Sequence, residues 1–120
     1  MQTITLKSSA FAHDGMMPKQ FTCDADDRSP PLELFGVSAK AKTLALIMHD
    51  PDAPMPGGFT HWVVWNIAST TTVIKQESVP AGASEGKNGA GRIGYTGPCP
   101  PSGTHRYFFK LYALDVVLSL

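Results

Sequence analysis

Residues 43 to 66 decide the fold of this chain. They read TLALIMHD at 43–50, PDAPMPGGF at 51–59 and THWVVWN at 60–66. The outer two runs have strand length and are rich in β-branched and apolar residues, whereas the nine residues between them include three prolines and two glycines. This pattern predicts two β-strands joined by a stiff loop. Because nearly every position from Leu44 to Met48 is apolar, we expect the first strand to lie centrally in its sheet, with both faces covered.

Further runs of strand length on either side predict a mainly β protein. No segment of about 10 residues or more has convincing helical periodicity. On the strand that begins at residue 60, alternation places His61 on the same face as Val63 and Trp65. Besides the strands at 43–50 and 60–68, we expect strands at residues 3–7, 19–24, 32–37, 71–75 and 105–114.

Length and composition limit the possible functions. At 120 residues the chain suits one domain, which we assign to residues 1–120. Ten acidic residues balance ten basic ones that are scattered along the chain, so we do not expect nucleic acid as a partner. No run approaches the roughly 20 apolar residues that span a bilayer, and the first residues do not resemble a signal peptide. We therefore expect a cytoplasmic protein without an integral membrane segment, where a reducing compartment would leave Cys23 and Cys99 as thiols.

The turn-rich span at 70–103 contains two motifs that look catalytic. GASEG at 82–86 matches the nucleophile elbow, and GAGRIG at 89–94 matches the dinucleotide-binding pattern. The first motif needs a strand before its serine and a helix after it, and the second must open a helix in a βαβ unit. The sequence predicts neither context, so we interpret both motifs as glycine-rich loops. We accordingly expect no enzymatic activity and no cofactor.

Four side chains with suitable binding chemistry lie at predicted strand ends. Asp50 ends one strand, His61 begins the next, and His105 and Tyr107 begin the last. Alternation places His105 and Tyr107 on one face, and we expect the two histidines to converge. Imidazoles and a phenol can donate hydrogen bonds to a small anion, nearby glycines expose backbone N–H groups, and Asp50 would orient one imidazole. These residues therefore predict an anion-binding site.

A divalent metal ion is the alternative ligand for these residues. Two histidines and a carboxylate can bind such an ion. The candidates are far apart in the sequence and include no local ligand pair, and Tyr107 would not assist a metal. We therefore favour the anion and predict no metal.

Four longer motifs are spread over nearly the whole chain. They are FTCDADDRSPPLE at 21–33, DPDAP at 50–54, GGFTHWVVWN at 57–66 and GRIGYTGPCPPSGTHRYFFKLYALD at 91–115. Together they closely resemble the phosphatidylethanolamine-binding protein family, and within it the bacterial and archaeal Raf-kinase-inhibitor-like branch. The resemblance implies a Greek-key β-sandwich with a small pocket for phosphate, phosphoryl headgroups or similar anions. By position it assigns pocket roles to Asp50, Pro54, His61, Gly97, Pro98, Pro100, His105 and Tyr107.

The resemblance also implies a class of function. We expect a non-enzymatic protein that binds phosphate-like anions or phospholipid headgroups and modulates a protein kinase or a serine protease. The alternative is an inhibitor that works by surface contact with a serine protease or kinase, for which the pocket is incidental. Whether pocket variants keep inhibition would separate the two hypotheses.

The carboxy-terminal end departs from the family pattern. Members usually continue past the LYALD strand through a helical segment and a closing strand, whereas this chain ends at VVLSL. We therefore expect a truncated form of the fold that lacks these elements and leaves a sheet edge and an apolar face uncovered. Such a surface predicts a homo-oligomer or marginal stability.

Overall fold

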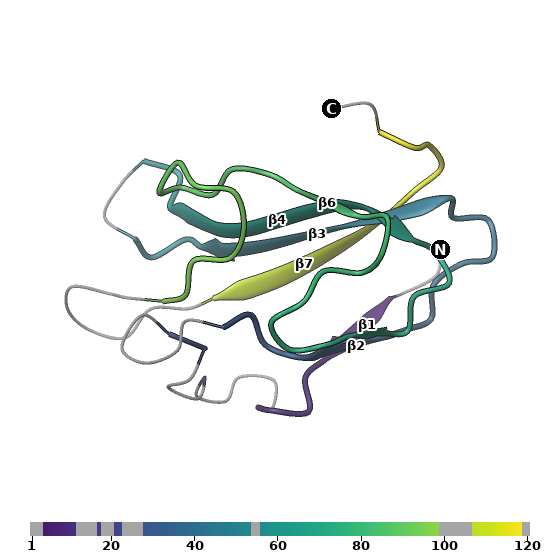
Figure 1. Cartoon of the computed structure of the whole chain (residues 1–120), viewed down its shortest axis with the longest axis horizontal. Helices are drawn as coiled ribbons and strands as arrows, with labels where there is room; N and C mark the ends of the chain where they lie inside the picture. Colours follow the sequence, from purple (N-terminus) through teal and green to yellow (C-terminus); the bar gives the residue numbers. More distant parts are fainter. Residues whose placement is uncertain are drawn as a thin grey trace.

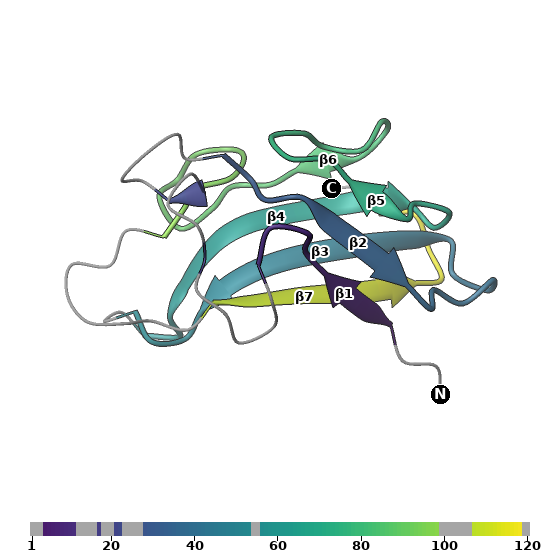
Figure 2. The ribbon, with the colours of Figure 1, turned by 90° about the horizontal axis from the view of Figure 1, so that it is seen from below.

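Two antiparallel β-sheets form separate layers in the computed structural model of the chain, which describes residues 4–11, 17, 21–22, 28–53, 56–98 and 107–118 (Figures 1 and 2). The smaller sheet has the order β1-β2-β5, formed by Thr5–Lys7, Leu32–Phe35 and Val73–Ile74. The larger sheet has the order β6-β4-β3-β7, formed by Ser84–Glu85, Phe59–Ala68, Thr43–Asp50 and Phe108–Leu114. The described segments include no helix long and apolar enough to cross a bilayer. The predicted mainly β sandwich is confirmed.

β3 lies between β4 and β7 in the larger sheet, as the sequence predicts for a central strand (Figure 1). Its side chains alternate in burial. Leu44, Leu46 and Met48 are fully buried, whereas Ile47 and His49 on the other face are only half-buried. The prediction that both faces are covered therefore holds for one face only, because the smaller sheet packs on one side of β3.

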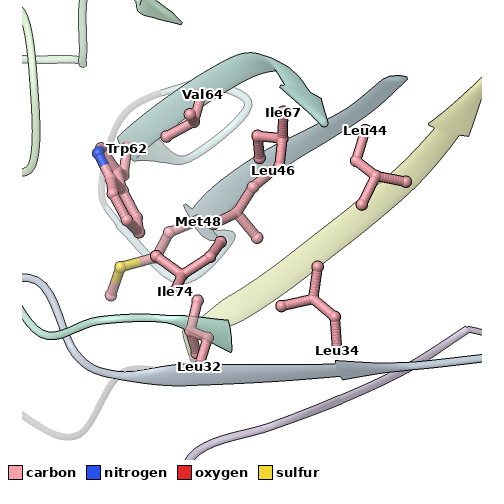
Figure 3. Close-up of a cluster of buried hydrophobic side chains, with 9 residues drawn as sticks. All are labelled: Leu32, Leu34, Leu44, Leu46, Met48, Trp62, Val64, Ile67 and Ile74. Carbon is pink, nitrogen blue, oxygen red and sulfur yellow. The ribbon is translucent and has the colours of Figure 1, made fainter. Parts of the chain in front are cut away.

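The hydrophobic core lies between the two sheets and draws on both of them. Figure 3 shows nine buried side chains meeting there. The smaller sheet contributes Leu32, Leu34 and Ile74, and the larger sheet contributes Leu44, Leu46, Met48, Trp62, Val64 and Ile67. Phe109 and Leu111 of β7 pack against the same cluster, as alternation along that strand predicts. Full burial of one such side chain stabilises the fold by roughly 1.5–3 kcal/mol.

The remaining predicted strands differ from the observed ones in extent. Those expected at 3–7, 32–37 and 71–75 are present but shorter. The strand expected at 19–24 falls mostly outside the described residues, and its described members, Phe21 and Thr22, are not in a strand. Within GASEG, Ser84 and Glu85 form β6 and pair with β4, so this motif is not only a loop. The GAGRIG motif opens no helix, in agreement with the sequence analysis.

Candidate functional site

One end of the larger sheet gathers polar side chains where the core meets the loops. β3 ends there at Asp50, which continues the buried row that includes Met48 and is itself 3% exposed. The register of β3 with β7 runs to the pair His49 and Phe108, so the next step sets Tyr107 beside Asp50. A buried carboxylate and a phenol thus extend the apolar face of the sheet.

A tight loop holds Asp50 in place. Its Oδ1 accepts the backbone N–H of Asp52 at 2.8 Å, the usual way in which an aspartate begins a turn. Gly58 returns close to the strand with a φ of +82°, and a Cβ at this position would collide with the carbonyl oxygen of Asp50. His49 Nε2 lies 2.8 Å from the Gly57 carbonyl oxygen, so this ring fastens the loop to β3. Glycine at position 58 is therefore required both by the backbone conformation and by the lack of space.

His61 lies at an irregularity of β4. Trp62 is opposite Met48 and Thr60 is opposite His49, so β4 carries one extra residue between these two pairs. A β-bulge of this kind re-aims side chains and is often found beside binding sites. His61 is the residue whose direction the bulge changes.

The ring of His61 meets the start of β7. Its centroid lies 5.4 Å from that of Tyr107 and 4.8 Å from that of Phe59, and both contacts are edge to face. Strict alternation predicted that His61 would share a face with Val63 and Trp65. The extra residue interrupts the alternation, and His61 instead joins Tyr107, which packs against the core.

A backbone carbonyl fixes the tautomer of His61. The residue is 4% exposed, and its Nδ1 lies 2.6 Å from the carbonyl oxygen of Thr96. A carbonyl oxygen can only accept a hydrogen bond, so Nδ1 carries the hydrogen and donates it. Nε2 is then an acceptor in the neutral ring and becomes a donor in the imidazolium ion. For His61, the orienting role that the sequence analysis gave to Asp50 belongs to Thr96.

Tyr107 stays protonated throughout the physiological pH range. Burial of the phenol, followed by the nearby carboxylates of Asp50 and Asp52, raises the pKa of Tyr107 to about 12. Each cause disfavours the negatively charged phenolate. The site therefore combines two carboxylates, a neutral phenol and an imidazole that donates from Nδ1.

The loop that supplies the Thr96 carbonyl is organised by the buried side chain of Asn88. Its Nδ2 donates to the Gly94 carbonyl oxygen at 2.9 Å and to Thr96 Oγ1 at 2.8 Å. Its Oδ1 accepts two further backbone N–H groups of the loop at 2.9 and 3.3 Å. The Thr96 N–H donates to the His61 carbonyl oxygen at 3.0 Å. Asn88 thus fixes the segment that in turn fixes His61.

The structure brings part of the predicted site together. The predicted residues that meet are Asp50, His61 and Tyr107. Two more follow Thr96 directly and are buried, and these are Gly97 and Pro98. Outside the described residues lie Pro54, Pro100 and His105. The expected convergence of the two histidines stays a prediction.

Sequence reasoning missed Phe59, Thr96 and Asn88. Phe59 could have been suspected from its two-residue spacing to His61. Thr96 acts through its backbone, and Asn88 is an ordinary loop residue in sequence, so neither gave a signal. As for the metal alternative, no three His, Cys, Asp or Glu side chains of the described segments are grouped as metal ligands.

Comparison with known proteins places this arrangement in a family. A family model described as phosphatidylethanolamine-binding protein matches residues 7–120. The chain belongs to the phosphatidylethanolamine-binding protein family. A UPF0098 protein of Methanothermobacter thermautotrophicus is 49% identical, over 98% of this chain and 80% of that protein. A UPF0098 protein of Archaeoglobus fulgidus is 45% identical, over 98% of this chain and 42% of that protein.

Two solved structures share the fold. A phosphatidylethanolamine-binding protein homologue from Chlamydia trachomatis has a TM-score of 0.92 and 41% identity, covering 98% of this chain and 78% of that one. E. coli YbcL, described as a member of the mammalian family, has a TM-score of 0.91 and 30% identity, covering 98% of this chain and 80% of that one. The family and the sandwich fold predicted from the sequence are therefore confirmed.

Proposed function

We propose that this protein binds a small phosphate-like anion or phosphoryl headgroup at the site of Asp50, His61 and Tyr107, and that it catalyses no reaction on it. The observation that carries the proposal is the edge-to-face packing of His61 and Tyr107 at 5.4 Å at the buried end of the sheet. Side chains this close can both bond to one small ligand. Membership of the phosphatidylethanolamine-binding protein family supports a binding role.

The charges around this site make anion binding depend on protons. Asp50 and Asp52 are negative and oppose an anion, and Tyr107 can donate a hydrogen bond without carrying charge. His61 gains positive charge through protonation of Nε2, because Nδ1 already donates to the Thr96 carbonyl. Histidine titrates near pH 6.5 when unperturbed, so anion affinity should rise as the pH falls through that region.

Calorimetric titration with two anions tests this dependence. Sulfate stays a dianion in this range and cannot donate to neutral Nε2, so its affinity should rise about tenfold from about pH 7.5 to about pH 5.5. Phosphate carries a proton of its own that can bond to neutral Nε2, so its affinity should change less. Sulfate affinity that does not vary with pH would contradict the proposed role of His61.

Variants identify the residues responsible. His61→Asn keeps an N–H donor for the Thr96 carbonyl but cannot become charged, so sulfate binding should weaken and lose its pH dependence. Tyr107→Phe should weaken binding at every pH, whereas Tyr112→Phe, on an exposed part of β7, is the matched control. Wild-type affinity in both His61→Asn and Tyr107→Phe would exclude the site. If the protein also modulates a kinase or a serine protease, loss of that effect in His61→Asn would favour pocket binding over surface contact.

A further inference from the structure

A second polar recess lies beside β6. It has a volume of about 260 Å³ and is lined by segments 28–29, 77–79 and 94–95 together with Glu85 of β6. Pockets for drug-sized ligands occupy about 300–1,000 Å³, so this recess suits one small polar group or a single side chain. None of the residues that form the anion site lines it.

Two of the three charges in the recess offset each other. Arg28 Nε lies 3.4 Å from Glu77 Oε2, and the two side chains are 40% and 66% exposed. Exposed pairs of this kind contribute little stability, so the pair can rearrange easily. The remaining charge of the lining is the carboxylate of Glu85.

Glu85 is anchored at one carboxylate oxygen. Its Oε2 accepts the indole N–H of Trp62 at 2.7 Å, and Trp62 belongs to the core. Among the described residues, Glu85 Oε1 has no hydrogen-bond partner. Gly94 lies beside this carboxylate with a φ of +116°, a backbone conformation that favours glycine, and a Cβ there would be in ordinary van der Waals contact with Oε2 at 3.5 Å. The recess thus presents a fixed negative oxygen that lacks a donor.

Ser29 gives the recess a second polar group that lacks a partner. The residue is 6% exposed, and its backbone carbonyl accepts the Glu77 N–H at 3.0 Å. Its hydroxyl makes no hydrogen bond to any part of the chain that the structure describes, although it is not sealed from solvent. Because this hydroxyl is open to solvent, a molecule that fills the recess can hydrogen-bond to it in place of water.

We propose that this recess binds a small organic cation, a primary ammonium or a guanidinium group, with Glu85 as its counter-ion and Ser29 as a hydrogen-bond partner. Tyr95 also lines the recess, with its hydroxyl fixed by the Phe21 carbonyl oxygen at 2.7 Å, and aromatic rings favour bound cations. The bound cation can be of two kinds, either a free amine or the Lys or Arg side chain of another protein. The inference does not depend on the anion site.

Trp62 provides a direct reporter, because its indole N–H bonds to Glu85. In nitrogen–proton correlation spectra of the whole chain, butylammonium chloride should move the Trp62 indole signal saturably and leave that of Trp65 in place. Butanol and sodium chloride at equal concentrations should not do so. If Nα-acetyl-lysine methylamide binds tighter than butylammonium, the source is a protein side chain, and otherwise it is a free amine. A linear shift that sodium chloride reproduces would overturn the proposal.

Variants separate the recess from general salt effects. Glu85→Gln keeps an acceptor for Trp62 but removes the charge, and should weaken butylammonium binding by about tenfold or more. Ser29→Ala leaves the charge and should weaken binding by about threefold, which keeps the test decisive if Glu85→Gln does not fold. Glu77→Gln at the exposed rim is the matched control and should change affinity less than Glu85→Gln. Unchanged affinity in both Glu85→Gln and Ser29→Ala would also overturn the proposal.

Discussion

β4 contains two bulges, and the side chains at them make different contacts. At one, Trp65 and Asn66 are together opposite Ala45, and Asn66 has a φ of +56°. Both ends of the Asn66 side-chain amide bond to the backbone of Leu118, at 2.8 and 2.9 Å. At the other, the ring of His61 is fixed at Nδ1 and lies beside Tyr107.

The difference shows that a bulge does not by itself make a binding site. The side chain of Asn66 bonds to the backbone of Leu118 and so holds the segment that follows β7. The bulge at His61 lies where a buried carboxylate, Asp50, and a phenol with a raised pKa, Tyr107, end the core. If the proposed function is correct, the polar groups that surround a bulge decide whether the re-aimed side chain holds the fold together or binds a ligand.

The largest loss of stability is expected for substitutions in the regularly paired part of β3 that lies between the two bulges. Leu46 is 0% exposed between the sheets, so Leu46→Ala should lower the free energy of unfolding by about 2–5 kcal/mol. Ile47, the next residue of β3, lies on the half-buried face, so Ile47→Ala removes a similar volume and should cost clearly less. Urea denaturation of both variants measures the difference. An equal loss of free energy of unfolding in both variants would show that the two faces of β3 are packed equally well.

A smaller loss of stability, measured together with the chemical shifts of His61, should distinguish the two bulges from each other. Asn88→Ala removes the hydrogen bonds that hold the loop at Thr96, and should destabilise the fold by about 1–3 kcal/mol. Because Thr96 fixes the His61 tautomer, the imidazole nitrogen chemical shifts of His61 should change as well. Asn66→Ala is the matched control, since it also removes two side-chain to backbone bonds, here partly buried, but should leave those shifts unchanged. Unaltered chemical shifts of His61 in Asn88→Ala would show that the loop held by Asn88 does not control the His61 ring.

The strands of this sandwich could be predicted from local pattern, whereas the details of their pairing could not. Alternation and apolar runs are properties of neighbouring residues, so the strands at 43–50 and 60–68 were found with nearly correct bounds. β6 was missed because two residues in a glycine-rich loop carry no pattern of their own, and only β4 gives them a partner. The bulge at His61 was missed because strict alternation assumes a regular register.

The candidate site was predictable to a similar degree. Asp50, His61 and Tyr107 could be chosen because they are chemically distinctive residues at strand ends. The Thr96 carbonyl could not, since every residue has a carbonyl and only the folded loop brings this one to His61. Polar contacts made by backbone atoms across long sequence separations are set by tertiary structure, which single-sequence patterns do not contain.

The smallest effect tests the protonation of Tyr107. Its pKa of about 12 in the folded protein exceeds the ordinary tyrosine value of about 10, so the folded state binds this proton more tightly. Below about pH 10 the folded and the unfolded protein both keep the phenol proton, so Tyr107 does not change the stability. As the pH rises from about 10 to about 12, the unfolded protein loses this proton first, and the stability of the fold decreases. In Tyr107→Phe this part of the loss of stability at alkaline pH should be absent.

The urea midpoints of wild type and Tyr107→Phe should be measured at about pH 8 and at about pH 11. Because lysines also lose protons near pH 11, the contribution of Tyr107 is the difference between the two proteins in their loss of stability. The difference should be small, because water reaches part of the phenol and screens its interaction with Asp50 and Asp52. Tyr112→Phe, at an exposed tyrosine, should lose as much stability as the wild type. If Tyr107→Phe behaves like Tyr112→Phe, neither burial nor the two carboxylates raises the pKa of Tyr107. Tyr107 would still be neutral at physiological pH, and the contrast with the bulge at Asn66 would rest on His61 and the buried Asp50.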